Sequence, residues 1–189
     1  MSRMQVELRE AQLDDALFLV ELWGDSLRRA DTREQVADLE PIIKEAAEST
    51  ELAILIAEYD GQVAGAVYLR IATLSPLNLE PTLQMFSLTV SQGFRRKGVG
   101  HALLDAAVAF AERAGVSLVA TAAASGSRDG NRFLARVGFG PQAMWRVALV
   151  HTVRARLTPL LPASQRRPAS RTSLVLAARR SMRRAQAEV

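Results

Sequence analysis

The chain has 189 residues, enough for one domain with a sizeable core, and its hydrophobic fraction of 49% is that of a globular protein. It has no cysteine, which excludes disulfides and thiolate chemistry, and its two histidines lie far apart, so we expect no metal site. The net charge of +4 is uneven, because residues 151–189 hold nine arginines and one glutamate.

The sequence also bears on location. No run of about 18 apolar residues is present, so no membrane span and no membrane partner are expected. The opening stretch MSRMQVELRE lacks the apolar segment of a secretory signal. We therefore expect a soluble, cytoplasmic protein.

The first half of the chain predicts an edge strand, two helical regions and a hairpin. Alternating apolar residues predict the strand over 5–10, and Asp14 and Asp15 predict a helix start whose apolar positions continue to residue 27. Pro41 is typical of the first position of a further helix. The Asp60-Gly61 pair between apolar runs predicts a hairpin over residues 52–72.

The second half alternates between strands and helices. Strands are predicted over 82–90, over 116–123, where the apolar run is typical of a strand covered on both faces, and over 142–150. Between them, helical spacing runs from Val99 to Ala111 with a stop at Gly115, and Ser127 and Gly138 bound a short helix. This order indicates a mixed α/β sheet.

Beyond residue 150 three prolines interrupt the chain, and residues 171–189 could form a basic helix, or "SLVLA" could add a strand. We therefore expect one domain over residues 1–150 and a basic, arginine-rich extension over 151–189 that is partly helical. Its charge and apolar centre favour a packing or dimer-forming segment, so a homodimer is possible.

The stretch VSQGFRRKGVGHALL, residues 90–104, joins a predicted strand to a predicted helix through three cations and two glycines. Backbone N–H groups and the helix dipole make such a helix start a site for an anion, here a pyrophosphate. The alternative is a glycine turn beside solvated cations. A P-loop is excluded because Val99 and Gly100 replace its Lys and Ser or Thr, and a dinucleotide fingerprint is excluded because Leu103 replaces its third glycine.

The longer stretch LTVSQGFRRKGVGHALL resembles the acetyl-CoA-binding motif of the GNAT superfamily of acyl-CoA N-acyltransferases, whose Q/R-x-x-G-x-G/A core maps to Arg95, Gly98 and Gly100. The resemblance extends over most of residues 5–149, including NRFLARVGF. It implies a mixed, mostly antiparallel central sheet flanked by helices, with a bulged central strand that splays from its neighbour.

The resemblance also implies where acetyl-CoA binds. The pantetheine arm would pair with the strand edge at Leu88, Thr89 and Val90, with the Leu88 N–H facing the thioester oxygen. Asn131 would reach the cofactor from the opposite wall, or is a polar residue at a helix start. The pyrophosphate would lie on the amides and cations of Arg95, Arg96, Lys97, Gly98, Val99, Gly100 and His101.

Family members commonly place a Tyr acid where this chain has Leu134, which cannot donate a proton. The strand LQMFSLTV holds no carboxylate, and the nearest polar candidates are Glu58, Glu80 and Ser87. Ser125 and Ser127 are weak candidates for a proton relay, with helix capping as the alternative. The catalytic acid and base are therefore unassigned.

Together these features predict an acetyl-CoA-dependent N-acetyltransferase in which an amine, on a small molecule or a protein, attacks the thioester directly in a ternary complex. The acceptor would enter beside the first two helices and the loop SLRRADTREQ. Two alternatives are a non-catalytic acyl-CoA sensor, favoured by the missing Tyr, and a nucleic-acid-binding protein. The second is disfavoured because residues 151–189 contain no aromatic residue to stack on bases.

Overall fold

The computed structural model describes residues 5–122, 126–142 and 146–157. The chain divides into two compact units, residues 1–140 and 141–189. The described part of the first unit holds a sheet and four α-helices, and that of the second holds one helix, α5 (Val150–Leu157). The predicted boundary near residue 150 stays a prediction.

The first unit is built on a five-stranded sheet whose strands lie in chain order. The first four are antiparallel to their neighbours and the fifth is parallel to the fourth. The predicted mixed, mostly antiparallel α/β sheet is confirmed. The strands are β1 (Val6–Glu10), β2 (Leu52–Tyr59), β3 (Gln62–Thr73), β4 (Pro81–Val90) and β5 (Leu118–Thr121).

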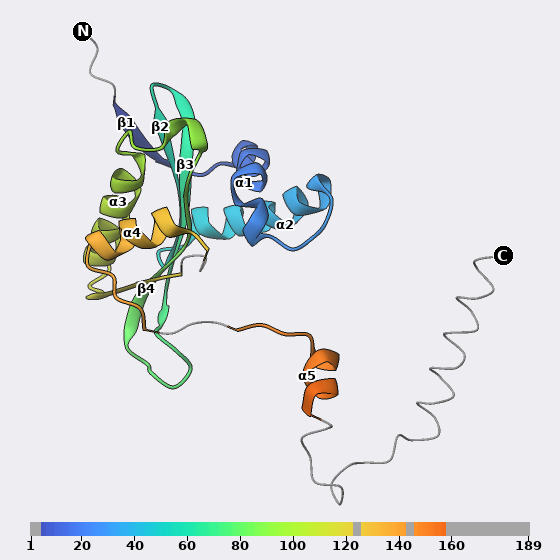
Figure 1. Ribbon diagram of the computed structural model, residues 1–189. Helices are drawn as coiled ribbons and strands as arrows, with labels where there is room; N and C mark the ends of the chain where they lie inside the picture. The colour runs from blue at the N-terminus through green and yellow to red at the C-terminus, as the bar shows by residue number, and fades with distance from the viewer. Residues whose placement is uncertain (1–4, 123–125, 143–145, 158–189) are drawn as a thin grey trace, which may run out of the picture. The chain divides into compact units, whose positions relative to one another are not determined.

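Helices cover both faces of the sheet (Figure 1). On one face, α1 (Ala16–Trp23) and α2 (Thr32–Glu48) bury Trp23 and Leu39 against Ile54 and Ile56. On the other, α3 (Val99–Arg113) buries a core with the opposite side of the same strands, and α4 (Arg128–Arg136) adds Phe133 to it. The alternating side chains of β2 thus serve two cores.

The hairpin between β2 and β3 turns at the predicted residues. Asp60 and Gly61 both have positive φ, 51° and 75°, as the two central residues of a type I′ turn require. The edge strand, the hairpin, the long helix starting at Val99 and the short helix capped by Ser127 are all confirmed.

The prediction that a helix begins at Pro41 is wrong. Helix α2 begins nine residues earlier at Thr32, because the Asp31 side chain caps it by accepting from the Glu34 N–H at 2.8 Å. Pro41 lies inside the helix and has no N–H to donate. The carbonyl group that is left unpaired is that of Ala37, which is exposed. An exposed carbonyl is accessible to solvent and is not a buried unpaired group, so the helix can continue through the proline.

The role expected of Asp15 at the start of α1 also differs. Its carboxylate accepts two hydrogen bonds from Arg9, at 2.7 and 2.8 Å, and one from the Gln12 N–H at 2.7 Å. Arg9 also donates to Glu58 at 2.6 Å. This pairing with Arg9 holds the pKa of Asp15 below its ordinary value. Asp15 therefore ties β1 to the start of the helical layer.

Two strand predictions near the C-terminal end need correction. The strand over 116–123 is shorter, Leu118–Thr121, and only half-buried, because β5 is the last strand of the sheet rather than an inner one. The predicted strand over 142–150 is not formed at residues 146–149, and helix α5 begins at Val150; residues 143–145 lie outside the described part.

The alternatives for residues 171–189, a basic helix or an added strand, also lie outside the described residues. Within the described ranges, no helix has both the length and the apolar character needed to cross a bilayer.

Candidate functional site

The central feature of the site is a break in the pairing of β4. Gly65 pairs with Val90 and Ala66 with Thr89, but the next pair is Tyr68 with Phe86, so β4 contains one extra residue. Ser87 has a φ of 51°, the left-handed conformation that a bulge of this kind needs.

The bulge changes which side chains face α3. Before it, the odd-numbered Leu83 and Met85 lie in the core under α3; after it, the even-numbered Leu88 and Val90 pack against the same core. Thr89 lies on the wall of a cleft that faces α1. A regular strand would have put Thr89 in the core and Leu88 toward α1.

The same part of β4 separates from β5. The parallel ladder runs from Thr82–Leu118 to Met85–Thr121 and ends there. From Phe86 onward β4 has no strand partner on that side among the described residues. The predicted bulged and splayed strand is confirmed, and its free edge carries Leu88, Thr89 and Val90.

The end of β4 is held close to β3 by a glycine. A Cβ on Gly65 would lie 2.7 Å from the Thr89 carbonyl oxygen and 3.3 Å from the Val90 Cα. Beside it, the Ser91 N–H donates to the Ala64 carbonyl at 2.8 Å. Only a residue without a side chain allows this approach, so Gly65 fixes the position of the free edge.

The loop between β4 and α3 contains a short 3-10 helix, η3 (Gln92–Phe94), and ends at Gly98, the N-cap of α3. Arg96 and Gly98 have φ values of 63° and 87°. Within the described part of the chain, the N–H groups of residues 96–100 donate to no acceptor. These amides and the positive end of a 15-residue helix form a place for an anion.

Gly100 supports this interpretation because the protein's own packing does not require a glycine there. A Cβ at this position would meet the Val90 side chain at 3.6 Å and the Phe133 ring at 3.9 Å, both ordinary contacts. A side chain would therefore fit at this position, so packing within the protein does not explain the glycine.

Two predicted cofactor residues also make contacts within the protein. The Lys97 ammonium lies over the rings of Tyr59, at 4.8 Å, and Phe94, at 5.2 Å. The His101 ring meets Phe133 edge-to-face at 5.0 Å, joining the first turn of α3 to α4. Arg95 and Arg96 are exposed and have no ion-pair partner among the described residues.

A cleft of about 300 Å³ opens between α1 and the free end of β4. The α1 side consists of Phe18, Glu21 and Leu22, one helical stripe, and the opposite side is residues 89–92 with Arg95. The cleft therefore adjoins the free strand edge and reaches the loop that leads to α3.

Helix α4 holds several of the other predicted site residues. The Ser127 hydroxyl accepts from the Gly130 N–H at 3.3 Å as the N-cap, and the Asn131 side chain donates to the Ser127 carbonyl at 2.7 Å. Both are thus engaged at the start of the helix, as the capping alternatives expected. Leu134 is half-buried, and Ser125 lies outside the described residues.

The carboxylates nearest in sequence are not near the free edge. Glu80 precedes the first residue of β4, at the end of the strand opposite to Leu88, and Glu58 is held by Arg9. The two tyrosines of the chain lie on β2 and β3. Tyr59 lies under Lys97, and Tyr68 lies beside Phe86 with its pKa raised by burial, so it keeps its proton at neutral pH.

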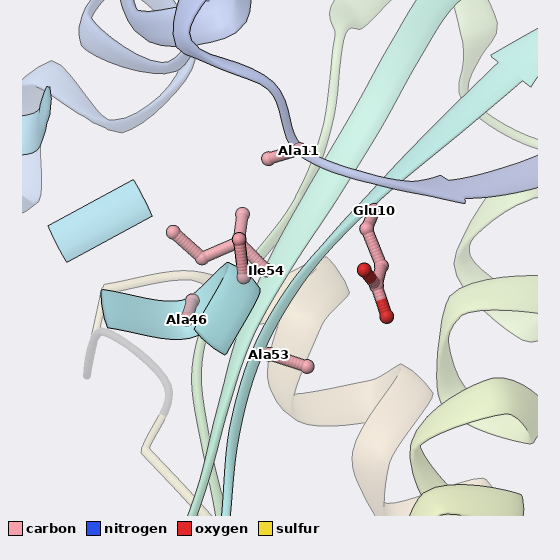
Figure 2. Close-up of a pocket in the computed structure, with 6 residues that line it drawn as sticks. Glu10, Ala11, Ala46, Ala53 and Ile54 are labelled. Atoms are coloured by element: carbon pink, nitrogen blue, oxygen red, sulfur yellow. The ribbon is translucent and has the colours of Figure 1, made fainter. Parts of the chain in front are cut away.

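A second depression, between the end of α2 and the β1–β2 pair, holds no site. Figure 2 shows Ala46 and Ala53 beside Ile54, with the Glu10 carboxylate pointing away from Ala46 and Ile54. The volume of this depression that a water molecule could enter is about 0 Å³. Among the described residues no group of three or more metal-ligating side chains occurs.

Glu21 is the residue of the cleft that sequence reasoning missed. The sequence shows that Glu21 has helical spacing with Phe18 and Leu22. However, α1 lies outside the acetyl-CoA-binding motif, and nothing in the sequence shows which turn of α1 lies beside β4. The packing of α1 against the sheet supplies that information.

Comparison with known proteins gives one family match and several matches in fold. Residues 16–139 match the model of the Acetyltransferase (GNAT) family, and no curated protein matches the chain. The chain is similar in fold to an aminoglycoside N-acetyltransferase, AAC(6')-Iy, in complex with CoA (17% identity, 79% of this chain and 97% of that one, TM-score 0.64).

Two further solved structures are similar. One is a predicted acetyltransferase with acetyl-CoA from Clostridium acetobutylicum (16% identity, 78% of this chain and 98% of that one, TM-score 0.60). The other is a glucosamine-6-phosphate N-acetyltransferase from Arabidopsis thaliana (15% identity, 77% and 99%, TM-score 0.60). At these identities the likeness concerns the fold.

Proposed function

The chain belongs to the acetyltransferase (GNAT) family, and we propose that it transfers an acetyl group from acetyl-CoA to a primary amine by direct attack in a ternary complex. The observation that carries the proposal is the break in β4. It leaves a free strand edge, a cleft and a helix start with unpaired amides in one continuous region.

In this proposal the free edge at Leu88, Thr89 and Val90 binds the pantetheine arm as a strand would, and the Leu88 N–H faces the thioester oxygen. The amides of residues 96–100 receive the pyrophosphate, and Arg95 and Arg96 add positive charge. Lys97 contributes its backbone and supports the loop through Tyr59 and Phe94. His101 and Asn131 lie on the α4 side.

The thioester supplies an activated acetyl group. The amine nitrogen forms a bond to the carbonyl carbon, the carbon–sulfur bond breaks, and the amine loses one proton, which gives an amide and CoA. An N–H donor aimed at the carbonyl oxygen favours this attack. Alignment of amine and thioester alone can contribute about 7 kcal/mol to lowering the barrier.

Leu134 takes the place of the expected acid, so the departing sulfur receives its proton from water or from the amine itself. Ser127 is occupied as a cap and its relay role remains an expectation, as does that of Ser125. We propose that the rate depends on positioning in the cleft rather than on a dedicated side-chain acid.

The test is a glutamate at the helix start. Gly100→Glu places a negative side chain beside the amides that receive the pyrophosphate, so acetyl-CoA affinity measured by calorimetry should fall by at least ~2 kcal/mol, about 30-fold. Val108→Glu is the control, because residue 108 is an exposed position farther along the same helix. Unchanged affinity in folded Gly100→Glu would refute the acetyl-CoA site.

A screen of primary amines for acetyl-CoA-dependent CoA release completes the test. Release with at least one amine, with the acetylated product found by mass spectrometry, supports the transferase. Tight acetyl-CoA binding with no release from any amine would instead favour the acyl-CoA sensor.

A further inference from the structure

The cleft beside the free edge carries one charge of each sign. Glu21 projects from α1 and Arg95 from the loop that follows β4, and both line the same space of about 300 Å³. Among the described residues neither charged group forms an ion pair, with the other or with a third residue. Two unpaired charges on opposite walls of one cleft are available to ligands.

The two substrates of the proposed reaction have opposite charges. Acetyl-CoA is anionic, and Arg95 directly precedes the amides that suit its phosphates. An acceptor amine is an ammonium ion at neutral pH and needs a negative partner. Glu21 is the only carboxylate that lines the cleft among the described residues.

The surroundings of Glu21 further restrict the acceptor. Phe18, three residues before Glu21, and Leu22, the residue after it, lie on the same wall of the cleft. The carboxylate is therefore flanked by apolar side chains of α1. Such a wall suits an amine with an apolar stem better than a polyhydroxylated one. The volume, shared with the arm of the cofactor, has room for a small molecule or one extended side chain.

We propose that Glu21 binds the ammonium group of the acceptor, and that the acceptor is a small primary amine with an apolar stem seated against Phe18 and Leu22. This inference rests on the proposed transferase function and specifies its second substrate. Charge pairing holds the amine on the α1 side of the cleft, facing the free edge at Thr89. The amine becomes a nucleophile when its proton passes to water.

The test uses phenethylamine as the probe and 2-phenylethanol as its uncharged counterpart, each titrated by NMR into the protein saturated with CoA. Wild type should bind the amine at least tenfold more tightly than the alcohol. Glu21→Gln should lose that preference, whereas Glu21→Asp should retain part of it. Glu40→Gln, an exposed glutamate on α2 with no hydrogen-bond or ion-pair partner among the described residues, should keep it fully.

The result also separates the two proposals. Suppose that CoA binds equally to wild type and to Glu21→Gln. The assignment of Glu21 is then wrong if Glu21→Gln still prefers the amine to the alcohol, or if wild type shows no such preference. Either result leaves the transferase proposal untouched. If CoA itself fails to bind, the transferase proposal fails first. Equal CoA affinity in both proteins also shows that Glu21→Gln has kept its fold.

Discussion

Replacing Gly65 with alanine is expected to displace the end of β4 and weaken acetyl-CoA binding. The new Cβ would lie 2.7 Å from the Thr89 carbonyl oxygen, whereas ordinary contacts begin at 3.4 Å, so the two strands must separate by several tenths of an ångström. The obstacle is backbone, so no side-chain rotation relieves it. The edge that moves is the one proposed to bind pantetheine.

The expected change in the free energy of unfolding is the balance of two opposing effects. Overpacking of a buried site costs about 1–3 kcal/mol, and removing a glycine from a strand returns about 0.5–1 kcal/mol. We therefore expect the free energy of unfolding to fall by about 1–2 kcal/mol. Because a hydrogen-bonding edge tolerates little misplacement, acetyl-CoA affinity should fall about tenfold.

Urea denaturation and calorimetry measure the two effects. Gly93→Ala is the matched control, since nothing lies within 4 Å of its Cβ and its φ is not positive. It should change neither stability nor affinity appreciably. A Gly65→Ala protein as stable as wild type, with the same acetyl-CoA affinity, would refute the reasoning that Gly65 sets the position of the edge.

Two further predictions concern single side chains. Asp15→Asn should lower the free energy of unfolding by about 1–2 kcal/mol at pH 7. Pairing with Arg9 lowers the pKa of Asp15 in the folded protein, so the carboxylate stabilises the fold at any pH above about 3.9, the ordinary pKa of Asp in an unfolded chain. The stability gap between the two proteins should shrink as pH falls below about 4, and a constant gap in urea titrations would contradict the pairing. Leu134→Ala should cost about 1 kcal/mol, since the side chain is half-buried. Its kcat should stay within a few-fold of wild type, and a loss beyond ~100-fold in a folded variant that binds acetyl-CoA would show that the position is essential to catalysis.

Elements with local signals could be predicted from the sequence. Asp60-Gly61 determines its own turn because both residues adopt positive φ readily. Gly98 similarly marks the start of α3. The prediction from Pro41 was wrong because the preference of proline for the first turn of a helix is weak. The cap at Asp31 and the burial of Leu39 and Ile43 stabilise the longer helix more strongly. The start of that helix is set by its cap, a local signal that outweighs the proline.

The candidate site was only partly predictable, for a different reason. The helix start could be identified from residues 95–100, which are contiguous. The bulge at Ser87 could be expected only from the family resemblance, since a serine with positive φ has no sequence signature. Glu21 and Arg95 are 74 positions apart in the sequence, and only the packing of α1 on the sheet brings them to one cleft.

The same geometry bears on how the chain could catalyse acetyl transfer without the expected tyrosine. An acid at residue 134 would assist sulfur departure, but a thiolate is a tolerable leaving group without one. Attack by the amine is then the step that the protein must promote. In the proposed mechanism it has two means of doing so: the free edge of β4, which would fix the thioester, and the carboxylate of Glu21, which would hold the amine opposite it. Loss of the acid is therefore compatible with catalysis as long as both walls of the cleft stay in place, and for this reason Gly65 and Glu21, rather than Leu134, should be the sensitive positions.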